Sequence, residues 1–413
     1  MKQHYLLLLI LFFIVSQSYS QQFVLQEDPM VQQFYIQNNQ KLFWFNSNKN
    51  IKRARVWLQV VTASDVYPSV STKLAMEKMN TALDHKNMID SVYKMEIDRQ
   101  ITWFVLSYIK SQQEGIKLFD YDDIAVKRDS VYIDQLNQSN IVQQLLKFEC
   151  KDPAYVLLKN YLTDSITTKD TLKYKAIQLA MNYRSYFSIN HQSEYIVVNV
   201  LSAEAEYYKN NTIVMGMRVV VGQKANPTPL FASYITSLVT FPHWNVPQSI
   251  AVKELIPKVQ KDKNYLEQNG FEVVDAKGNE VDESELHWKE YTENNFPFFF
   301  RQSTGGDNAL GVLKFNLKNP YSVFLHATSN QEVFSRTNRF LSHGCIRLEK
   351  PFELANALLE TKLNVEEMKT AKQYTESNTI MLPHKIPTFI IYMPVQIVGK
   401  KITFLPDVYG LIK

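Results

Sequence analysis

The sequence predicts an α+β protein with a mostly helical N-terminal half and a β-rich C-terminal half that carries a helical insertion. Of the 11 glycines in the 413 residues, only Gly115 precedes residue 200, and of the 15 prolines only Pro29, Pro68 and Pro153 do. A region with so few turn residues is expected to be helical. After Ser193 the chain becomes rich in Val and Ile at alternating positions, which is typical of strands.

The chain opens with a short apolar run that predicts a secretory signal peptide over residues 1–20. In "MKQHYLLLLILFFIVSQSYSQQ" a lysine precedes 11 residues from Tyr5 to Val15, which are almost all apolar, and Ser18 and Ser20 follow. Eleven residues are too few to span a bilayer, which needs roughly 20. Small residues after such a run fit a cleavage site. The alternative is an uncleaved segment that tethers the protein to the membrane.

Helical periodicity continues through residues 21–192, which we expect to form a scaffold domain without chemistry of its own. Residues 71–110 place apolar side chains at steps of three and four, with Ser71 at the predicted helix start. The segments 139–150, 152–162 and 169–187 follow the same pattern.

The second half, residues 193–413, alternates strands with one inserted lobe. Residues 194–222 predict a hairpin that turns at Asn210–Asn211, and further strands are expected within 234–241, 312–319, 322–328, 388–397 and 401–410. Between them, residues 247–273 predict helices with Ser249 as the N-cap, a break at Pro257 and an end at Gly270. We therefore expect a surface lobe over residues 246–300. A further amphipathic helix is expected within 349–360, with Pro351 in its first turn.

Charge and cysteine content narrow the class of function. The net charge is +4 with acidic and basic residues interspersed, so no nucleic-acid groove is indicated. An exported protein usually pairs its cysteines, but Cys150 and Cys345 lie far apart in the sequence. Two free thiols are the preferred interpretation, with Cys150 as a small buried side chain, and a disulfide between them is the alternative.

The stretch "LSHGCIRLEKP", residues 341–351, has the residue types of a cysteine nucleophile. Such a thiol needs a base or cation to become a thiolate, and it needs donors for the oxyanion that forms on attack. His326 ends a predicted strand, and Gly344 allows a sharp turn before Cys345. We expect a helix dipole just after Cys345 to lower the thiol pKa, and Arg347 to favour a substrate that bears a carboxylate. A zinc site built from His326, His343 and Cys345 is the alternative.

The pattern of His326, a gap, and then Ser342-His343-Gly344-Cys345-Ile346-Arg347 resembles the signature of the YkuD-type L,D-transpeptidases, which cross-link peptidoglycan. Further stretches resemble the YcbB branch of that family, and they occur in the expected order over nearly the whole chain after residue 20. They are "FYIQNNQKLFWF", "MRVVVGQKANPTPLF", "FPHWNVPQSIAVKELIPKV", "NNFPFFFRQSTGGDNALGVLKFNL", "FLHAT" and "LPDVYG".

The resemblance implies a β-sandwich-like catalytic domain whose lobe acts as a lid. It implies that Cys345 forms a thioester with a stem peptide, that His326 moves the proton, and that backbone N–H groups around His343, Gly344 and Cys345 hold the oxyanion. Substrate contacts are expected from Arg347, Trp244, Asn308 and Ser342. The implied partners are donor and acceptor stem peptides of peptidoglycan and carbapenem-type inhibitors, the implied location is the periplasm of a Gram-negative-type cell, and no cofactor or metal is implied.

Two departures from the YcbB pattern affect this interpretation. No peptidoglycan-binding module fits between the predicted helices 152–162 and 169–187. Some members have serine where this chain has His343, which points to His326 as the base. Three alternatives stay open: an L,D-carboxypeptidase, a transferase that attaches an outer-membrane protein through its lysine, and an inactive scaffold that binds the cell wall. The intact pair of His326 and Cys345 argues against the last.

Overall fold

The computed structural model describes residues 28–63, 70–114, 117–124, 150–164, 170–190, 192–292, 295–370 and 375–412. The predicted signal peptide, residues 1–20, lies outside these ranges. The chain divides into two compact units. Unit 1 falls within Met1–Ile116, Val126–Val156 and Arg184–Ile189, and unit 2 within Lys117–Ala125, Leu157–Tyr183 and Asn190–Lys413. No helix in the described ranges combines the length and the apolar content needed to cross a bilayer.

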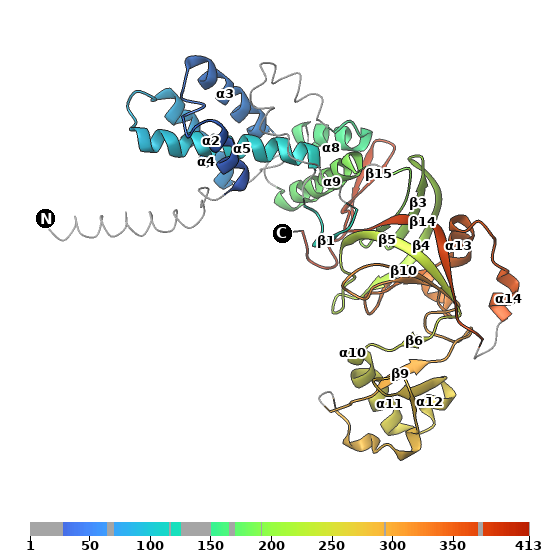
Figure 1. Cartoon of the computed structure of the whole chain (residues 1–413). Coiled ribbons are helices and arrows are strands. Elements are labelled where there is room, and N and C mark those ends of the chain that lie inside the picture. The colour runs from blue at the N-terminus through green and yellow to red at the C-terminus, as the bar shows by residue number, and fades with distance from the viewer. Residues whose placement is uncertain are drawn as a thin grey trace. The chain divides into compact units, whose positions relative to one another are not determined.

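The described part of unit 1 is helical, and two of its helices lie in the stretch 71–110, where helical periodicity was expected. Its helices include α2 (Pro29–Gln37), α3 (Asn48–Ala63), α4 (Val70–Asp84) and α5 (Ser91–Glu114) (Figure 1). The chain breaks between α4 and α5 because Asp90 accepts a hydrogen bond of 2.8 Å from the backbone N–H of Tyr93. This is the geometry of an N-cap, so a new helix begins there.

A buried carboxylate organises the core of unit 1. The side chain of Asp98 on α5 is 0% exposed and accepts hydrogen bonds from the backbone N–H groups of Phe43, Trp44 and Phe45. The hydroxyl of Tyr35 also donates to it. These donors satisfy the carboxylate, so the loop after α2 is fixed against α5 by hydrogen bonds as well as by apolar packing.

The helices α8 (Pro153–Asp164) and α9 (Thr171–Ile189) agree with the predicted segments. The helix expected over 139–150 lies outside the described residues except for Cys150, which is buried and whose thiol donates to the carbonyl of Arg184 at 3.8 Å. Both cysteines are free thiols. The boundary between residues 192 and 193 stays a prediction, and unit 2 also includes segments on its N-terminal side.

Ten of the described strands of unit 2 form one sheet in the order β1-β5-β10-β11-β13-β4-β3-β2-β14, with β12 paired to β4. A further pairing of β14 with β5 closes this sheet on itself. The strands are β1 (Tyr121–Asp122), β2 (Glu194–Asn199), β3 (Glu204–Lys209), β4 (Thr212–Gly222), β5 (Phe231–Thr240), β10 (Leu313–Leu317), β11 (Leu325–His326), β12 (Phe340–Ser342), β13 (Ile346–Leu348) and β14 (Asn378–Ile391).

Local signals predicted several of these elements correctly. Asn210 and Asn211 have φ angles of 49° and 61° and join β3 to β4, as the favoured hairpin turn requires. Helix α13 (Pro351–Leu358) begins with its proline in the first turn. The chain continues through α14 (Val365–Thr370), and a separate two-stranded sheet of β15 (Val395–Val398) and β16 (Lys401–Phe404) follows β14.

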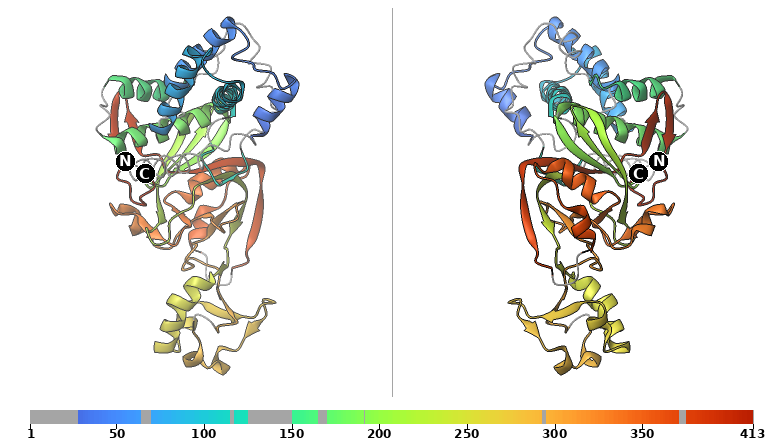
Figure 2. Two further views of the ribbon diagram at one scale, coloured as in Figure 1. Left: turned by 90° about the vertical axis from the view of Figure 1, so that its left-hand side faces the viewer. Right: turned by 90° about the vertical axis from the view of Figure 1, so that its right-hand side faces the viewer.

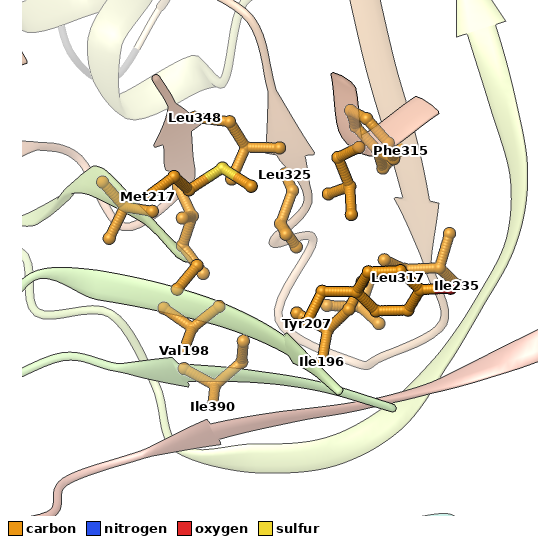
Figure 3. Packing of buried hydrophobic residues seen from close by; sticks show 14 of the residues in the cluster. Ile196, Val198, Tyr207, Met217, Ile235, Phe315, Leu317, Leu325, Leu348 and Ile390 are labelled. Carbon is orange, nitrogen blue, oxygen red and sulfur yellow. The ribbon is translucent and has the colours of Figure 1, made fainter. Parts of the chain in front are cut away.

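One apolar core fills the inside of the closed sheet. Alternate residues on the strands point inward, so the side chains of Phe315, Leu325 and Leu348 are each 0% exposed (Figure 3). The intervening residues on β10, β11 and β13 point to the opposite face. The alternation that directs apolar side chains into the core therefore also places a row of other side chains on the opposite face of the sheet.

The inserted lobe has a sheet and a core of its own, in contrast to the expected helical lid. Strands β6 (Trp244–Asn245), β9 (Phe299–Gln302), β7 (Phe271–Val274) and β8 (Glu280–Val281) pair in that order. Its helices are α10 (Gln248–Ile250), a π-helical turn (Ala251–Leu255), α11 (Ile256–Lys261) and α12 (Tyr265–Gln268). Two short 3-10 turns, Glu283–Glu285 and Trp288–Glu290, also belong to the lobe, and a further one, Gln331–Ser335, lies outside it.

The start and break signals predicted for this lobe were wrong, and its end signal is confirmed. The N-cap of α10 is Pro247 and not Ser249, and Pro257 lies in the first turn of α11, where proline is tolerated, without ending the helical path. Gly270 has a φ of 64° and follows α12, as expected for a helix end. The lobe lies beyond one end of the large sheet in both views of Figure 2.

Candidate active site

Three basic side chains form a row across neighbouring strands on the face opposite the core. Lys314 on β10 pairs with His326 on β11, and His326 pairs with Arg347 on β13. Neighbouring strands lie about 4.8 Å apart, and residues in register point to the same face. Cys345 comes two residues before Arg347, so alternation places its thiol on this face as well. Sequence reasoning missed Lys314, because only the strand register brings it here.

Cys345 lies in the loop between β12 and β13. The backbone N–H of the next residue, Ile346, donates to the carbonyl of Phe324 at 3.1 Å, which fixes the loop against the strand of His326. The thiol donates to the carbonyl of Ser322 at 3.8 Å. In this resting arrangement no hydrogen bond joins the thiol to the imidazole of His326.

The electrostatics of Cys345 differ from the sequence expectation. Burial raises the pKa of the Cys345 thiol, and a backbone hydrogen bond at Phe324 and the charges of Lys314 and Arg347 oppose that rise. The expected helix dipole is absent at this position, because residues 346–348 form β13 and α13 begins only at Pro351. The thiol is therefore protonated at neutral pH, and a base would be needed to convert it to a thiolate.

The imidazole of His326 lies on the same face. Its side chain is 4% exposed, and its ring lies 5.7 Å from that of Phe324 in an edge-on contact. Burial, with the charges of Arg347 and Lys314, lowers the pKa of His326 to about 3 against backbone hydrogen bonds at Ala327 and Leu310. The imidazole is therefore neutral at physiological pH and available to accept a proton.

Arg347 and Lys314 are cations held in a desolvated setting. Burial lowers the pKa of both side chains, and the buried Nε of Arg347 has no hydrogen-bond partner in the described part of the chain. The ammonium of Lys314 lies 4.2 Å from the ring centroid of Phe324. Half-buried cations that no carboxylate pairs with in the described part of the chain are suited to bind an anionic group of a ligand.

The loop that carries Cys345 is held in shape by Ser342. The hydroxyl of Ser342 donates to the carbonyl of Cys345 at 2.6 Å and accepts from the N–H of Gly344 at 3.1 Å. Gly344 has a φ of 118°, which side-chain-bearing residues rarely adopt. Because Ser342 is 3% exposed and occupied by these bonds, it shapes the loop and does not face a substrate. The N–H of Gly344 already donates to the hydroxyl of Ser342. Of the expected oxyanion donors, the N–H groups of His343 and Cys345 are therefore left to bind a ligand.

A second clamp comes from Thr228, which sequence reasoning did not find. Its buried hydroxyl donates to the carbonyl of Gly344 at 2.8 Å and accepts from the N–H of Gly222 at 2.8 Å. The hydroxyl of Tyr409, in the "LPDVYG" stretch, donates to the carbonyl of Gly222 at 2.5 Å. The segment that carries Tyr409 thus supports the loop of Cys345.

Asn308 and Gly311 support His326 from behind. The amide of Asn308 donates to the carbonyls of Pro242 and Ser303 and accepts from the N–H of Leu310 at 2.7 Å. With an exposure of 2%, Asn308 holds its loop and is kept from direct contact with a substrate. A Cβ atom on Gly311 would lie 2.8 Å from the Cβ atom of Ala327, so only glycine fits there.

His343 and Trp244 contact the lobe. The Nε2 atom of His343 lies 2.6 Å from Oε1 of Glu254, in the π-helical turn, and the two side chains are 38% and 41% exposed. Trp244 pairs with Gln302 in the lobe sheet, and its ring lies 6.1 Å from that of Phe271. It packs against the lobe core, and its contact with a substrate stays a prediction.

Comparison with known families decides the class of this site. The family described as "L,D-transpeptidase catalytic domain" (YkuD) matches residues 193–370, and the family described as "Scaffold domain" matches residues 29–162. Residues 193–370 are an L,D-transpeptidase catalytic domain. The YkuD-type fold and the helical scaffold expected from the sequence are therefore confirmed.

A curated relative of this L,D-transpeptidase domain comes from Haemophilus influenzae and is named "Putative L,D-transpeptidase". It is 36% identical over 236 residues, which cover 56% of this chain and 47% of the relative. The chain thus spans about half the length of the curated relative that it matches.

Solved structures are similar only in part. The Ldtfm–avibactam carbamoyl enzyme has 12% identity and a TM-score of 0.23, with 49% of this chain and 50% of that chain covered. The E. faecium catalytic domain acylated by ertapenem has 12% identity and a TM-score of 0.23, with 48% and 98% covered. At these scores the two structures add nothing to what the family models show.

Among the described residues, no group of three or more His, Cys, Asp or Glu side chains is placed to hold a metal ion.

Proposed function

We propose that the chain is a peptidoglycan L,D-transpeptidase that forms 3→3 cross-links through a thioester on Cys345. The observation that carries the proposal is the row of Lys314, His326 and Arg347 beside Cys345, within a domain of the L,D-transpeptidase family. A neutral base and two cations beside one thiol supply what acyl transfer from an anionic peptide requires.

The first half-reaction is acylation. The thiol turns from the carbonyl of Ser322 towards His326 and loses its proton to the imidazole as sulfur attacks the carbonyl between the third and fourth residues of the donor stem. The N–H groups of His343 and Cys345 hold the oxyanion. The C–N bond then breaks, the imidazolium passes its proton to the departing amine of the terminal D-alanine, and a thioester remains.

The second half-reaction is transfer. The side-chain amine of a second stem attacks the thioester carbonyl, the new C–N bond forms and the C–S bond breaks. The sulfur regains a proton, so the thiol is restored. We propose that Arg347 and Lys314 bind a carboxylate of the donor stem, because both are desolvated and neither is paired with a protein carboxylate in the described residues.

We further propose that the lobe limits the access of water to the thioester, so that transfer prevails over hydrolysis. Export through the predicted signal peptide to the periplasm of a Gram-negative-type cell belongs to the same proposal, since peptidoglycan lies there. A carbapenem is expected to acylate the same thiol and serves as a probe of it.

One experiment tests the proposal. Purified protein is incubated with disaccharide-tetrapeptide, and intact protein and products are analysed by mass spectrometry. We expect a tripeptidyl adduct on Cys345 and a cross-linked dimer, and Cys345→Ala loses both products as well as the carbapenem adduct. Free tripeptide as the sole product would mean hydrolysis, and an adduct on Cys150 would refute the assignment of the nucleophile. In a further reaction, an outer-membrane protein that carries a lysine is offered in place of the second stem, which tests whether a protein lysine is the acceptor.

A further inference from the structure

The cysteine loop holds a second imidazole whose environment differs from that of His326. His326 is 4% exposed and lies on the sheet face with the cations. His343 is two residues before Cys345, its side chain is 38% exposed, and its Nε2 atom lies 2.6 Å from a carboxylate oxygen of Glu254. One imidazole is therefore buried beside the thiol, and the other is open to solvent and oriented by an acid.

The position of Glu254 is fixed by the lobe. Its neighbours in the π-helical turn, Ala251 and Leu255, are 0% and 4% exposed in the lobe core. The N–H groups of Ile250 and Ala251 both donate to the carbonyl of Pro247 at 2.9 Å, which holds the start of this segment. π-Helical turns occur frequently at functional sites. The lobe thus presents one carboxylate to the loop of the nucleophile.

The transfer step needs a proton acceptor on the solvent side. As the amine nitrogen of the acceptor bonds to the thioester carbon, it gains positive charge and must lose a proton. With Nε2–H donating to Glu254, the Nδ1 atom of His343 keeps a free lone pair. A carboxylate that fixes one nitrogen of an imidazole sets the tautomer and leaves the other nitrogen as the base.

We infer that His343 is the base for the acceptor amine and that Glu254 is its positioning residue, an inference that rests on the proposed function. As the N–C bond forms and the C–S bond breaks, a proton of the amine moves to Nδ1 of His343. The sulfur leaves as a thiolate, and the proton returns to it through solvent. His326 keeps the acylation step, so the two histidines divide the two half-reactions.

The test uses the full chain and measures each half-reaction separately. Acylation is followed by intact mass with a carbapenem. Transfer is followed as the loss of a pre-formed tripeptidyl adduct after mixing with disaccharide-tetrapeptide as acceptor. Glu254→Gln keeps the hydrogen bond and removes the charge, and Glu254→Ala removes both. The matched control is Glu272→Gln, because Glu272 forms an ion pair of the same length, 2.6 Å, with Arg301 inside the lobe.

We expect acylation to stay within about twofold in both Glu254 variants, and transfer to fall about 10-fold in Glu254→Gln and about 100-fold in Glu254→Ala and His343→Ala, near the lower end of the range for a general base. Glu272→Gln should transfer at the wild-type rate. Hydroxylamine, which attacks thioesters without help from a base, should discharge the adduct equally fast in all variants.

An unchanged rate of transfer in Glu254→Ala would overturn the inference. It would also be overturned if transfer and hydroxylamine discharge slowed to the same extent, because Glu254 would then only hold the loop of Cys345 against the lobe. Failure of the proposed function is distinguishable, because the wild-type protein would then form no tripeptidyl adduct at all. Thermal melting of each variant separates these outcomes from a loss of fold.

Discussion

The clamp on the Gly344 carbonyl gives a sharp prediction for the oxyanion site. The carbonyl of Gly344 and the N–H of Cys345 belong to one peptide group, and in a planar trans peptide they point in opposite directions. By accepting the Thr228 hydroxyl at 2.8 Å, that carbonyl fixes the direction of the N–H. Replacement of Thr228 by valine keeps the shape of the side chain and removes the hydroxyl.

The magnitude follows from the two bonds that are lost. In Thr228→Val the N–H of Gly222 and the carbonyl of Gly344 lose their hydrogen-bond partner. Thr228 is only 1% exposed, so water cannot easily replace that partner. Each unsatisfied buried group costs about 1–3 kcal/mol, so the free energy of unfolding should fall by about 2–4 kcal/mol after partial relaxation. Loss of one oxyanion donor costs about 100- to 1000-fold in rate. A loosened donor should slow carbapenem acylation by about 10- to 100-fold.

The assay compares two reactions of the same thiol. Carbapenem attack passes through an oxyanion, whereas alkylation by iodoacetamide does not. We expect Thr228→Val to slow the first reaction and leave the second within about twofold, and Thr228→Ser to restore acylation because it keeps the hydroxyl. Equal rates of carbapenem acylation in wild type and Thr228→Val would refute the role of the clamp.

Four further predictions concern His326 and the scaffold. His326→Ala should lower the acylation rate by about 100- to 10,000-fold, and a larger loss in His343→Ala would exchange the two roles. Since burial lowers the pKa of His326 to about 3, the imidazole stays neutral from pH 7 to pH 5, and the acylation rate should be flat over that range, whereas an inflection near pH 6.5 would indicate an ordinary imidazole. The lowered pKa of His326 stabilises the folded state above pH 6.5, and this stabilisation is lost as the pH falls towards 3. The free energy of unfolding of the wild type should therefore decrease between pH 6.5 and pH 3, and it should decrease less steeply in His326→Gln. Asp98→Ala leaves three backbone N–H groups, one buried and two partly buried, without their acceptor and should lower the stability of unit 1 by about 3 kcal/mol, measured by denaturant unfolding.

Signals local in the sequence predicted much of the site and fold. The order of His326, Gly344 and Cys345 predicted a nucleophile in a tight turn, and the turn has the φ angle that requires glycine. The pair Asn210–Asn211 predicted the hairpin for the same reason, since both residues tolerate a positive φ. Such features depend on a few consecutive residues and on backbone sterics.

Features that depend on competition between neighbours were misread. The residues after Cys345 were expected to begin a helix, but Ile346 and Leu348 fill the core of the closed sheet and form β13. Periodicity across residues 71–110 hid the break at Asp90, because apolar spacing continues on both sides of it. In the lobe, Phe271 and Phe300 lie on strands whose pairing no local pattern reveals.

The role of Lys314 illustrates why the rest of the site needed the fold. In the sequence it is one lysine in "VLKFNLKN", 31 positions from Cys345 by subtraction of their numbers. It reaches the site because β10 pairs with β11 in the register that sets Lys314 opposite His326. A shift of that register by one residue would turn Lys314 into the core and Phe315 towards the thiol. The inward packing of Leu313 and Phe315, each 0% exposed, prevents that shift. The apolar core therefore also determines which charges surround Cys345.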